Sequence, residues 1–128
     1  MNKFKSFTSI EQSKKLAEIL PLESTDMRYG YIAPYEFSDR MYEGGYDDVP
    51  YPKDFMKRNP NFSENEYDGE FPCWSLASLL GVLPSATLDS SNDHYYRLHC
   101  MERFTEWYDN PIDACYEMIL KLHEQKIL

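Results

Sequence analysis

Cys73 is the residue of this chain best suited to nucleophilic chemistry. It lies near the start of the apolar run 71–84, and a thiol in the first turn of a helix has a lowered pKa. A cysteine nucleophile also needs a positioned base, which His94 or His99 would have to supply through the fold. The neighbours of Cys73 are apolar, so we expect a buried packing thiol and predict no catalytic residue.

The cysteines and histidines could also form a zinc site, which the spacing between them in the sequence would have to allow. The side chains that would have to form it are Cys73, His99, Cys100, Cys115 and His123. No C-x-x-C pair occurs, and the adjacent His99 and Cys100 would point to opposite faces of a strand. We therefore predict no metal site.

Oxygen ligands and paired carboxylates give equally weak signals. The positions Asn59, Asn61, Ser63, Asn65 and Glu70 follow the spacing of a calcium loop, but Glu64 stands where that loop needs glycine. Asp47-Asp48 and Glu102/Glu106 are typical of solvated surface charge. No phosphate loop, dinucleotide fingerprint, nucleophile elbow or zinc-protease motif occurs, so we expect no cofactor and no enzyme signature.

Residues 22–70 combine aromatic rings with carboxylates. Seven of the eleven tyrosines lie there, and residues 21–72 hold twelve Asp/Glu against five Lys/Arg. Tyrosine gives amphipathic contact area and is enriched at interfaces. We predict a partner-binding surface here, made of Tyr42, Tyr46, Asp47, Asp48 and Tyr51. The alternative is that these rings fold inward and hold the segment in place.

Charge and composition limit the possible partners. The net charge of −9 disfavours direct binding to nucleic acid or to an anionic membrane, and favours a basic protein surface or simple solubility. No apolar stretch approaches the length of a membrane span. Three cysteines without a secretory signal favour a reducing, cytoplasmic location. The length of 128 residues suits one domain, 1–128.

The helices and strands that must position these residues are predicted from the spacing of apolar residues and from the residues that begin or end such elements. Capping patterns and apolar spacing predict helices over 8–20, 72–84 and 110–122 or beyond. Alternation predicts a hairpin of 94–101 with 103–108, and a third strand at 87–88. Residues 22–70 show no lasting period, so we predict a long irregular insertion with short helical turns such as 53–58. The expected fold class is α+β, with about three helices packed on a small antiparallel sheet.

Three stretches of the chain carry recognisable motifs: residues 7–21 (FTSIEQSKKLAEILP), residues 72–76 (PCWSL), and residues 106–111 (EWYDNP) running into 113–115 (DAC) and 121–124 (KLHE). Together they resemble a family of small uncharacterised proteins of gut bacteria and their phages and mobile elements. The resemblance covers about half the chain and implies a genomic context but no activity. Residues 27–70 fall outside it.

Three kinds of function remain open from the sequence. We expect a non-enzymatic accessory protein of a phage or mobile element that acts by protein contact, with mimicry of nucleic-acid charge as a sharper version. The alternative is a small-ligand-binding protein or small enzyme with a pocket near Trp74 and Trp107. A further option is an oligomerising protein that docks through its end at Ile127 and Leu128.

Overall fold

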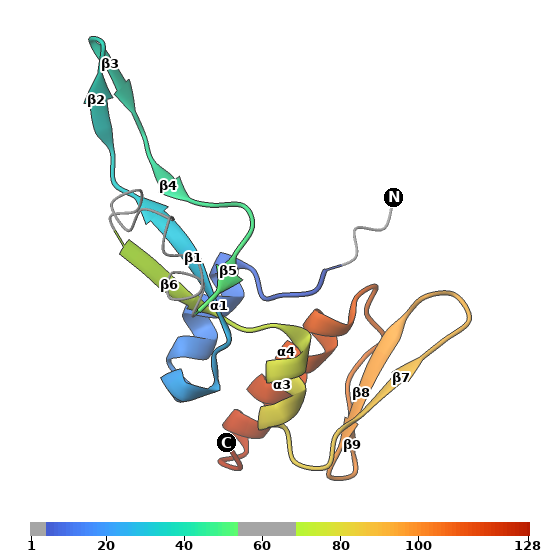
Figure 1. Ribbon diagram of the computed structural model, residues 1–128. Helices are drawn as coiled ribbons and strands as arrows, with labels where there is room; N and C mark the ends of the chain where they lie inside the picture. The colour runs from blue at the N-terminus through green and yellow to red at the C-terminus, as the bar shows by residue number, and fades with distance from the viewer. Residues whose placement is uncertain (1–4, 54–68) are drawn as a thin grey trace.

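The computed structural model describes residues 5–53 and 69–128 and shows an α+β fold, as the sequence predicts (Figure 1). The described elements are, in chain order, α1 (Ile10–Ala17), the 3-10 turn η1 (Leu22–Ser24), β1 (Met27–Ile32), β2 (Tyr35–Phe37), β3 (Arg40–Tyr42), β4 (Gly45–Tyr46), β5 (Tyr51–Pro52), β6 (Gly69–Cys73), α3 (Leu76–Val82), β7 (Thr87–Ser90), β8 (Tyr96–Cys100), β9 (Arg103–Phe104) and α4 (Pro111–Glu124).

Helices α1 and α4 begin where the capping residues predict. Ser9 Oγ accepts the Gln12 backbone N–H at 3.1 Å, and the Gln12 side chain accepts the Ser9 N–H at 3.1 Å. This reciprocal pair is a capping box. In α4, Asn110 Oδ1 accepts the Asp113 N–H at 2.9 Å, and Pro111 occupies the first turn, where a missing N–H costs nothing.

The hydrophobic core lies between α3, α4 and the inner face of the β7–β8–β9 sheet (Figure 1). The apolar stripe predicted for α4 is buried along its length. The fully buried side chains of this core include Trp74, Leu79, Leu98, Ile112, Cys115, Met118, Ile119 and Leu122.

Strands β7, β8 and β9 form the predicted antiparallel meander. Leu88 lies opposite Leu98, and His99 lies opposite Phe104. After β9, the Thr105 N–H donates to the Leu98 carbonyl at 3.0 Å, and Thr105 Oγ1 accepts the Leu98 N–H at 2.9 Å. The predicted third strand at 87–88 is confirmed as β7, and its Leu88 packs against the core.

The apolar run 71–84 does not form one helix, so the prediction of a helix from residue 72 is wrong for its first residues. Pro72 belongs to β6 and lies opposite Arg28 of β1. In the described part of the chain β6 pairs with β1 alone, and a proline without an N–H is tolerated on such an edge strand. Helix α3 begins only after Ser75, whose Oγ accepts the Ser78 N–H at 3.3 Å.

The prediction of an irregular insertion over 22–70 is wrong for 27–52, which carries β1 to β5. Strand β1 is the centre of a sheet and pairs antiparallel with β4, β5 and β6. Strands β2 to β5 have two or three residues each and are too short to show a period of two. The burial of β1 does not alternate, because the consecutive residues Tyr29 and Gly30 are both buried. Residues 54–58 of the predicted helical turn, and positions 59–65 of the calcium-loop alignment, lie outside the described residues.

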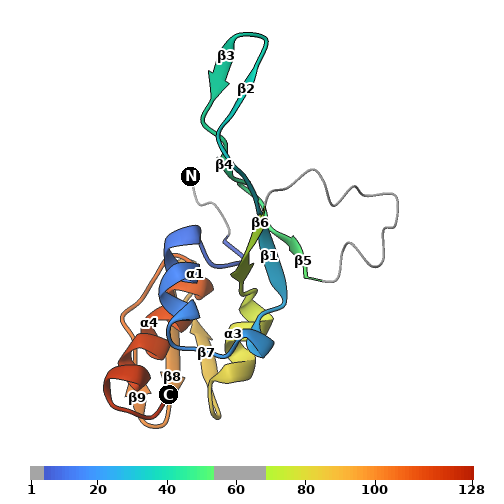
Figure 2. The same cartoon turned by 90° about the vertical axis from the view of Figure 1, so that its left-hand side faces the viewer.

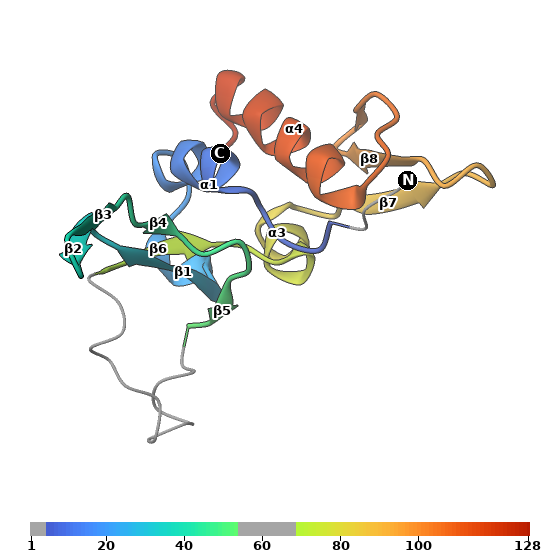
Figure 3. The ribbon, with the colours of Figure 1, turned by 90° about the horizontal axis from the view of Figure 1, so that it is seen from above.

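Strands β2 and β3 pair with each other in a sheet of their own. Figure 2 shows this hairpin projecting from the end of β1, away from the helices and the meander. Figure 3 shows α1 and the β1 sheet on one side of the molecule and α4 with the meander on the other, with α3 between them. The hairpin and its base, residues 33–49, are called the arm below.

Candidate functional site

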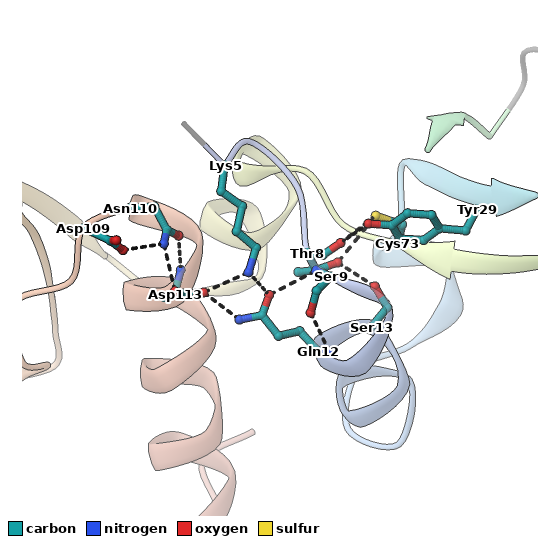
Figure 4. A network of polar contacts seen from close by, with 10 residues as sticks. All are labelled: Lys5, Thr8, Ser9, Gln12, Ser13, Tyr29, Cys73, Asp109, Asn110 and Asp113. Atoms are coloured by element: carbon teal, nitrogen blue, oxygen red, sulfur yellow. Dashed lines mark hydrogen bonds and ion pairs between the residues drawn. The ribbon is translucent and has the colours of Figure 1, made fainter. Parts of the chain in front are cut away.

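Cys73 lies at the end of a strand, fully buried, in a cluster of hydroxyl groups (Figure 4). Its Sγ is 3.5 Å from the Thr8 Oγ1, which in turn lies 2.7 Å from Ser13 Oγ. Burial raises the pKa of the Cys73 thiol, although hydrogen bonds from Thr8, Ser13 and Tyr29 act in the opposite direction. A buried thiol with a raised pKa is protonated, so the cluster serves packing and not nucleophilic attack.

His94 and His99, the two candidate general bases for Cys73, lie on other elements than the strand that carries Cys73. His94 is exposed in the β7–β8 loop, and the ring of His99 stacks on Phe104 with centroids 4.2 Å apart. Within the described residues, no group of three or more His, Cys, Asp or Glu side chains is placed to hold a metal ion. Cys100, one of the side chains considered for the zinc site, donates from its thiol to the Pro84 carbonyl at 3.0 Å.

A second polar network joins α1 to α4 (Figure 4). Lys5 Nζ lies 3.0 Å from Asp113 Oδ1, Gln12 Nε2 donates to the same oxygen at 2.7 Å, and Asn110 donates to Oδ2 at 2.8 Å. Burial alone would raise the pKa of Asp113, but the hydrogen bonds from Asn110, Gln12 and Lys5 outweigh it and lower the pKa. With each carboxylate oxygen partnered, this network holds the fold together.

The two tryptophans do not share a pocket. Trp74 is fully buried and donates from Nε1 to Ser24 Oγ at 2.9 Å. Trp107 is exposed, and with Ser91 and Tyr95 it lines an open hollow of about 340 Å³. Ser91 Oγ in that hollow already accepts the N–H groups of Asp93 and Tyr95. The hollow therefore offers an apolar surface without converging polar groups.

The arm carries the three most exposed large apolar side chains of the described chain, Met41, Phe37 and Val49. Phe37 is 66% exposed and Met41 is 72% exposed. Phe37 and Met41 lie close to the two-residue turn Ser38-Asp39, which joins β2 to β3. Both turn residues have positive φ angles, 52° and 62°, as a type I′ turn requires. The chain thus folds back sharply while it holds both apolar side chains in solvent.

The base of the arm is fixed by aromatic contacts. The rings of Tyr31 and Tyr46 are 5.0 Å apart, and Tyr46 meets Phe71 edge-on at 6.2 Å. Lys14 of α1 places its ammonium 5.5 Å from the Tyr46 centroid. These contacts bind the start of the arm to β6 and α1, while no contact of this kind holds its tip among the described residues.

Gly44 gives the arm its sharp bend between β3 and β4. Its φ is +69°, and a Cβ there would lie 2.2 Å from the Ile32 carbonyl oxygen. Only glycine allows this approach of the two backbones. Beside the bend, an open hollow of about 450 Å³ is lined by side chains from β2, β3 and β4.

The predicted partner surface is brought together only in part. Tyr42, Tyr46 and Asp47 line the hollow beside Gly44. Asp48 and Tyr51 do not line it, and Tyr51 donates from its hydroxyl to Glu70 Oε2 at 2.8 Å. The sequence analysis missed Phe37 and Met41, two of the most exposed large apolar residues. The signal that could have found them is the Ser38-Asp39 turn between aromatic and apolar residues.

The chain matches no protein-family model, no curated protein and no solved structure. The resemblance to small proteins of gut bacteria and their mobile elements therefore stays a prediction.

Among the described residues, no helix is long and apolar enough to cross a bilayer.

Proposed function

We propose that this chain is a non-enzymatic binding protein whose arm contacts a partner protein. The observation that carries the proposal is the exposure of Phe37 and Met41 at the end of a projecting hairpin. Exposed large apolar side chains gathered on a projecting element mark contact sites, because they cost solubility and contribute nothing to the core.

The hairpin also lacks support from the rest of the fold. β2 pairs with β3 alone in the described chain, and their best internal contact is the stacked ring pair Tyr35–Tyr42, 4.9 Å apart. A two-stranded hairpin without a further layer is marginally stable in water. Phe37 pairs with Arg40 and Met41 pairs with Glu36, so the two apolar side chains lie on opposite faces of the hairpin. A partner that surrounds the tip of the arm would cover both.

Charge favours a partner with a basic rim. The arm carries five carboxylates, of Glu36, Asp39, Glu43, Asp47 and Asp48, and a single cation, Arg40. Complementary charge at the rim of an interface speeds association and excludes acidic competitors.

Mimicry of nucleic-acid charge is less well supported than an apolar contact. A cleft built for phosphate groups binds charge, and its binding falls steeply with salt. Phe37 and Met41 would add nothing to such a contact, whereas they suit an apolar pocket surrounded by basic groups. An accessory role in a phage or mobile element rests on the sequence resemblance.

The experiment compares partner capture by the wild type and by the double variant Phe37→Ser, Met41→Ser. Extracts of the native host are passed over each immobilised protein at low and at moderate salt, and each captured protein is then purified and titrated. Loss of anchor residues weakens an interface by about 2 kcal/mol or more, so we expect the dissociation constant to rise by about thirtyfold or more.

The matched control is Leu22→Ser, which removes an exposed apolar side chain on η1, outside the arm. The control should bind as the wild type does, and both variants should keep the wild-type melting temperature. A specific partner that binds the arm variant and the wild type equally well would disprove the proposal.

A further inference from the structure

We infer that the meander binds a proline-rich segment of a partner protein in the polyproline II conformation. The binding site is the open hollow of about 340 Å³ that is lined by Ser91, Tyr95 and Trp107. The meander and the arm lie at opposite ends of the molecule (Figure 1). The inference therefore goes beyond the proposed function and uses none of the residues of the arm.

Trp107 is held in place on the outer face of the meander. Leu98 of β8 is buried in the core, so its neighbour Arg97 lies on the opposite face of the sheet. Arg97 Cζ is 4.6 Å from the centroid of the Trp107 ring and 4.5 Å from that of Phe104. The same guanidinium donates from Nη2 to Asp89 Oδ2 at 3.1 Å. A ring that is already fixed loses little conformational freedom when a ligand binds.

Tyr95 is held by the loop that joins β7 to β8. Its backbone N–H donates to Ser91 Oγ at 3.2 Å, and its carbonyl accepts the Ser91 N–H at 2.9 Å. The side chains of Tyr95 and Trp107 are nevertheless exposed. Two fixed and exposed aromatic side chains that line one hollow mark a contact site for an apolar group.

The hydrogen-bonding groups of the hollow favour a ligand that accepts hydrogen bonds and donates none. The Trp107 indole N–H and the Tyr95 hydroxyl have no partner among the described residues. Ser91 Oγ, by contrast, already accepts the N–H groups of Asp93 and Tyr95. A proline-rich segment has this pattern, because proline has no N–H and the carbonyls of a polyproline II helix form no internal hydrogen bonds.

Other classes of ligand fit the hollow less well. A cationic group would compete with Arg97 for the face of the Trp107 ring. A ligand that carries phosphate groups would be repelled by a chain with a net charge of −9. A proline ring is apolar and uncharged, and its backbone is already restricted before binding, so it contacts both aromatic rings without either penalty.

The test titrates the intact protein with acetylated L-octaproline amide and follows the indole N–H signals of its two tryptophans by NMR. We expect a saturable shift of the Trp107 signal and no shift of the signal of Trp74, which is buried and bonded to Ser24. The control peptides are D-octaproline, which forms the helix of opposite hand, and a flexible glycine-serine peptide of the same length. Each should bind about tenfold more weakly or worse.

Two variants locate the binding site. Tyr95→Ala removes one wall of the hollow and should weaken L-octaproline binding by about tenfold or more. The matched control Tyr42→Ala removes an exposed tyrosine of the arm and should bind as the wild type does. An unchanged Trp74 signal in each variant shows that the core is intact.

Three results would each overturn the inference. They are the absence of a saturable Trp107 shift at millimolar L-octaproline, equal binding of either control peptide, and wild-type affinity in the Tyr95→Ala protein. The double variant of the arm should bind L-octaproline as the wild type does. The two proposals therefore fail separately.

Discussion

Thr8 is the residue that joins the most partners in the buried polar cluster. Its carbonyl accepts from the Tyr29 hydroxyl at 2.6 Å, and its Oγ1 accepts the Trp74 N–H at 3.2 Å. The same hydroxyl contacts Ser13 and Cys73. Each buried polar group in this cluster therefore has a partner, which removes the desolvation cost that would otherwise oppose folding.

The three cysteines should be unreactive in the folded protein. Cys73, Cys100 and Cys115 are all buried and unpaired, and burial raises the pKa of Cys115 to about 12. At pH 8 a thiol reagent should modify the native protein far more slowly than a free cysteine peptide, and it should modify three thiols per chain in denaturant. One thiol that reacts natively at the peptide rate would restore Cys73 as a candidate nucleophile.

Asp113 should make the fold sensitive to acid. Its pKa in the folded state is lowered, so the folded state binds this proton less readily than the unfolded state does. The stabilisation is therefore complete above the ordinary carboxyl pKa of about 4 and is lost as the pH falls through the lower folded value. Denaturant titrations of the wild type and of Asp113→Asn should converge as the pH falls below the lowered folded pKa of Asp113, and the wild type should be the more stable at pH 7.

The variant Glu18→Gln is the control for that comparison, since Glu18 is exposed and its ion pair with Lys15 lies on the surface. It should change stability little at either pH. An Asp113→Asn protein as stable as the wild type at pH 7 would show that the network between α1 and α4 contributes nothing.

At the scale of single elements, Trp74 connects β6 to α3 and fills the core between them. It is fully buried, and its indole N–H is bonded to Ser24. Trp74→Ala removes a large buried ring and leaves a cavity, so we expect a loss of about 3–5 kcal/mol in the free energy of unfolding. Denaturant unfolding measures it, and a near-neutral result would contradict the buried position.

The elements that sequence reasoning predicted are those with local signals. Asn110-Pro111 and the long apolar stripe define α4 on their own, and the alternation around Leu98 defines the meander. The start of α3 was misplaced because Pro72 suits a first helical turn and an edge strand equally well. Only the pairing of Pro72 with Arg28 decides between them, and a contact so distant in sequence leaves no local pattern.

The arm could be predicted in composition but not in shape. Its tyrosines and carboxylates predict a contact surface, which stays a prediction, and of the residues named for it Tyr42, Tyr46 and Asp47 lie together. The hollow depends on the bend at Gly44 and on the Tyr35–Tyr42 register, which pairing across the hairpin sets. Sequence spacing carries no information on which face of so short a strand is exposed.

At the scale of the whole molecule, the chain separates a packed body from a projecting arm (Figure 2). The body has a buried core and its cysteines lie inside it. The arm is joined to it through β1 and the aromatic contacts of Tyr46. A change at the tip of the arm should therefore affect binding without unfolding the body.

Hydrogen exchange in the free protein and in its complex tests the central claim most directly. In the free protein the backbone amides of 35–42 should exchange quickly, because the hairpin has no third strand or covering layer in the described chain. In the complex with a captured partner these amides should exchange at least about tenfold more slowly, while those of α4 stay unchanged. Protection confined to the meander, with the arm exchanging as it does in the free protein, would contradict the account.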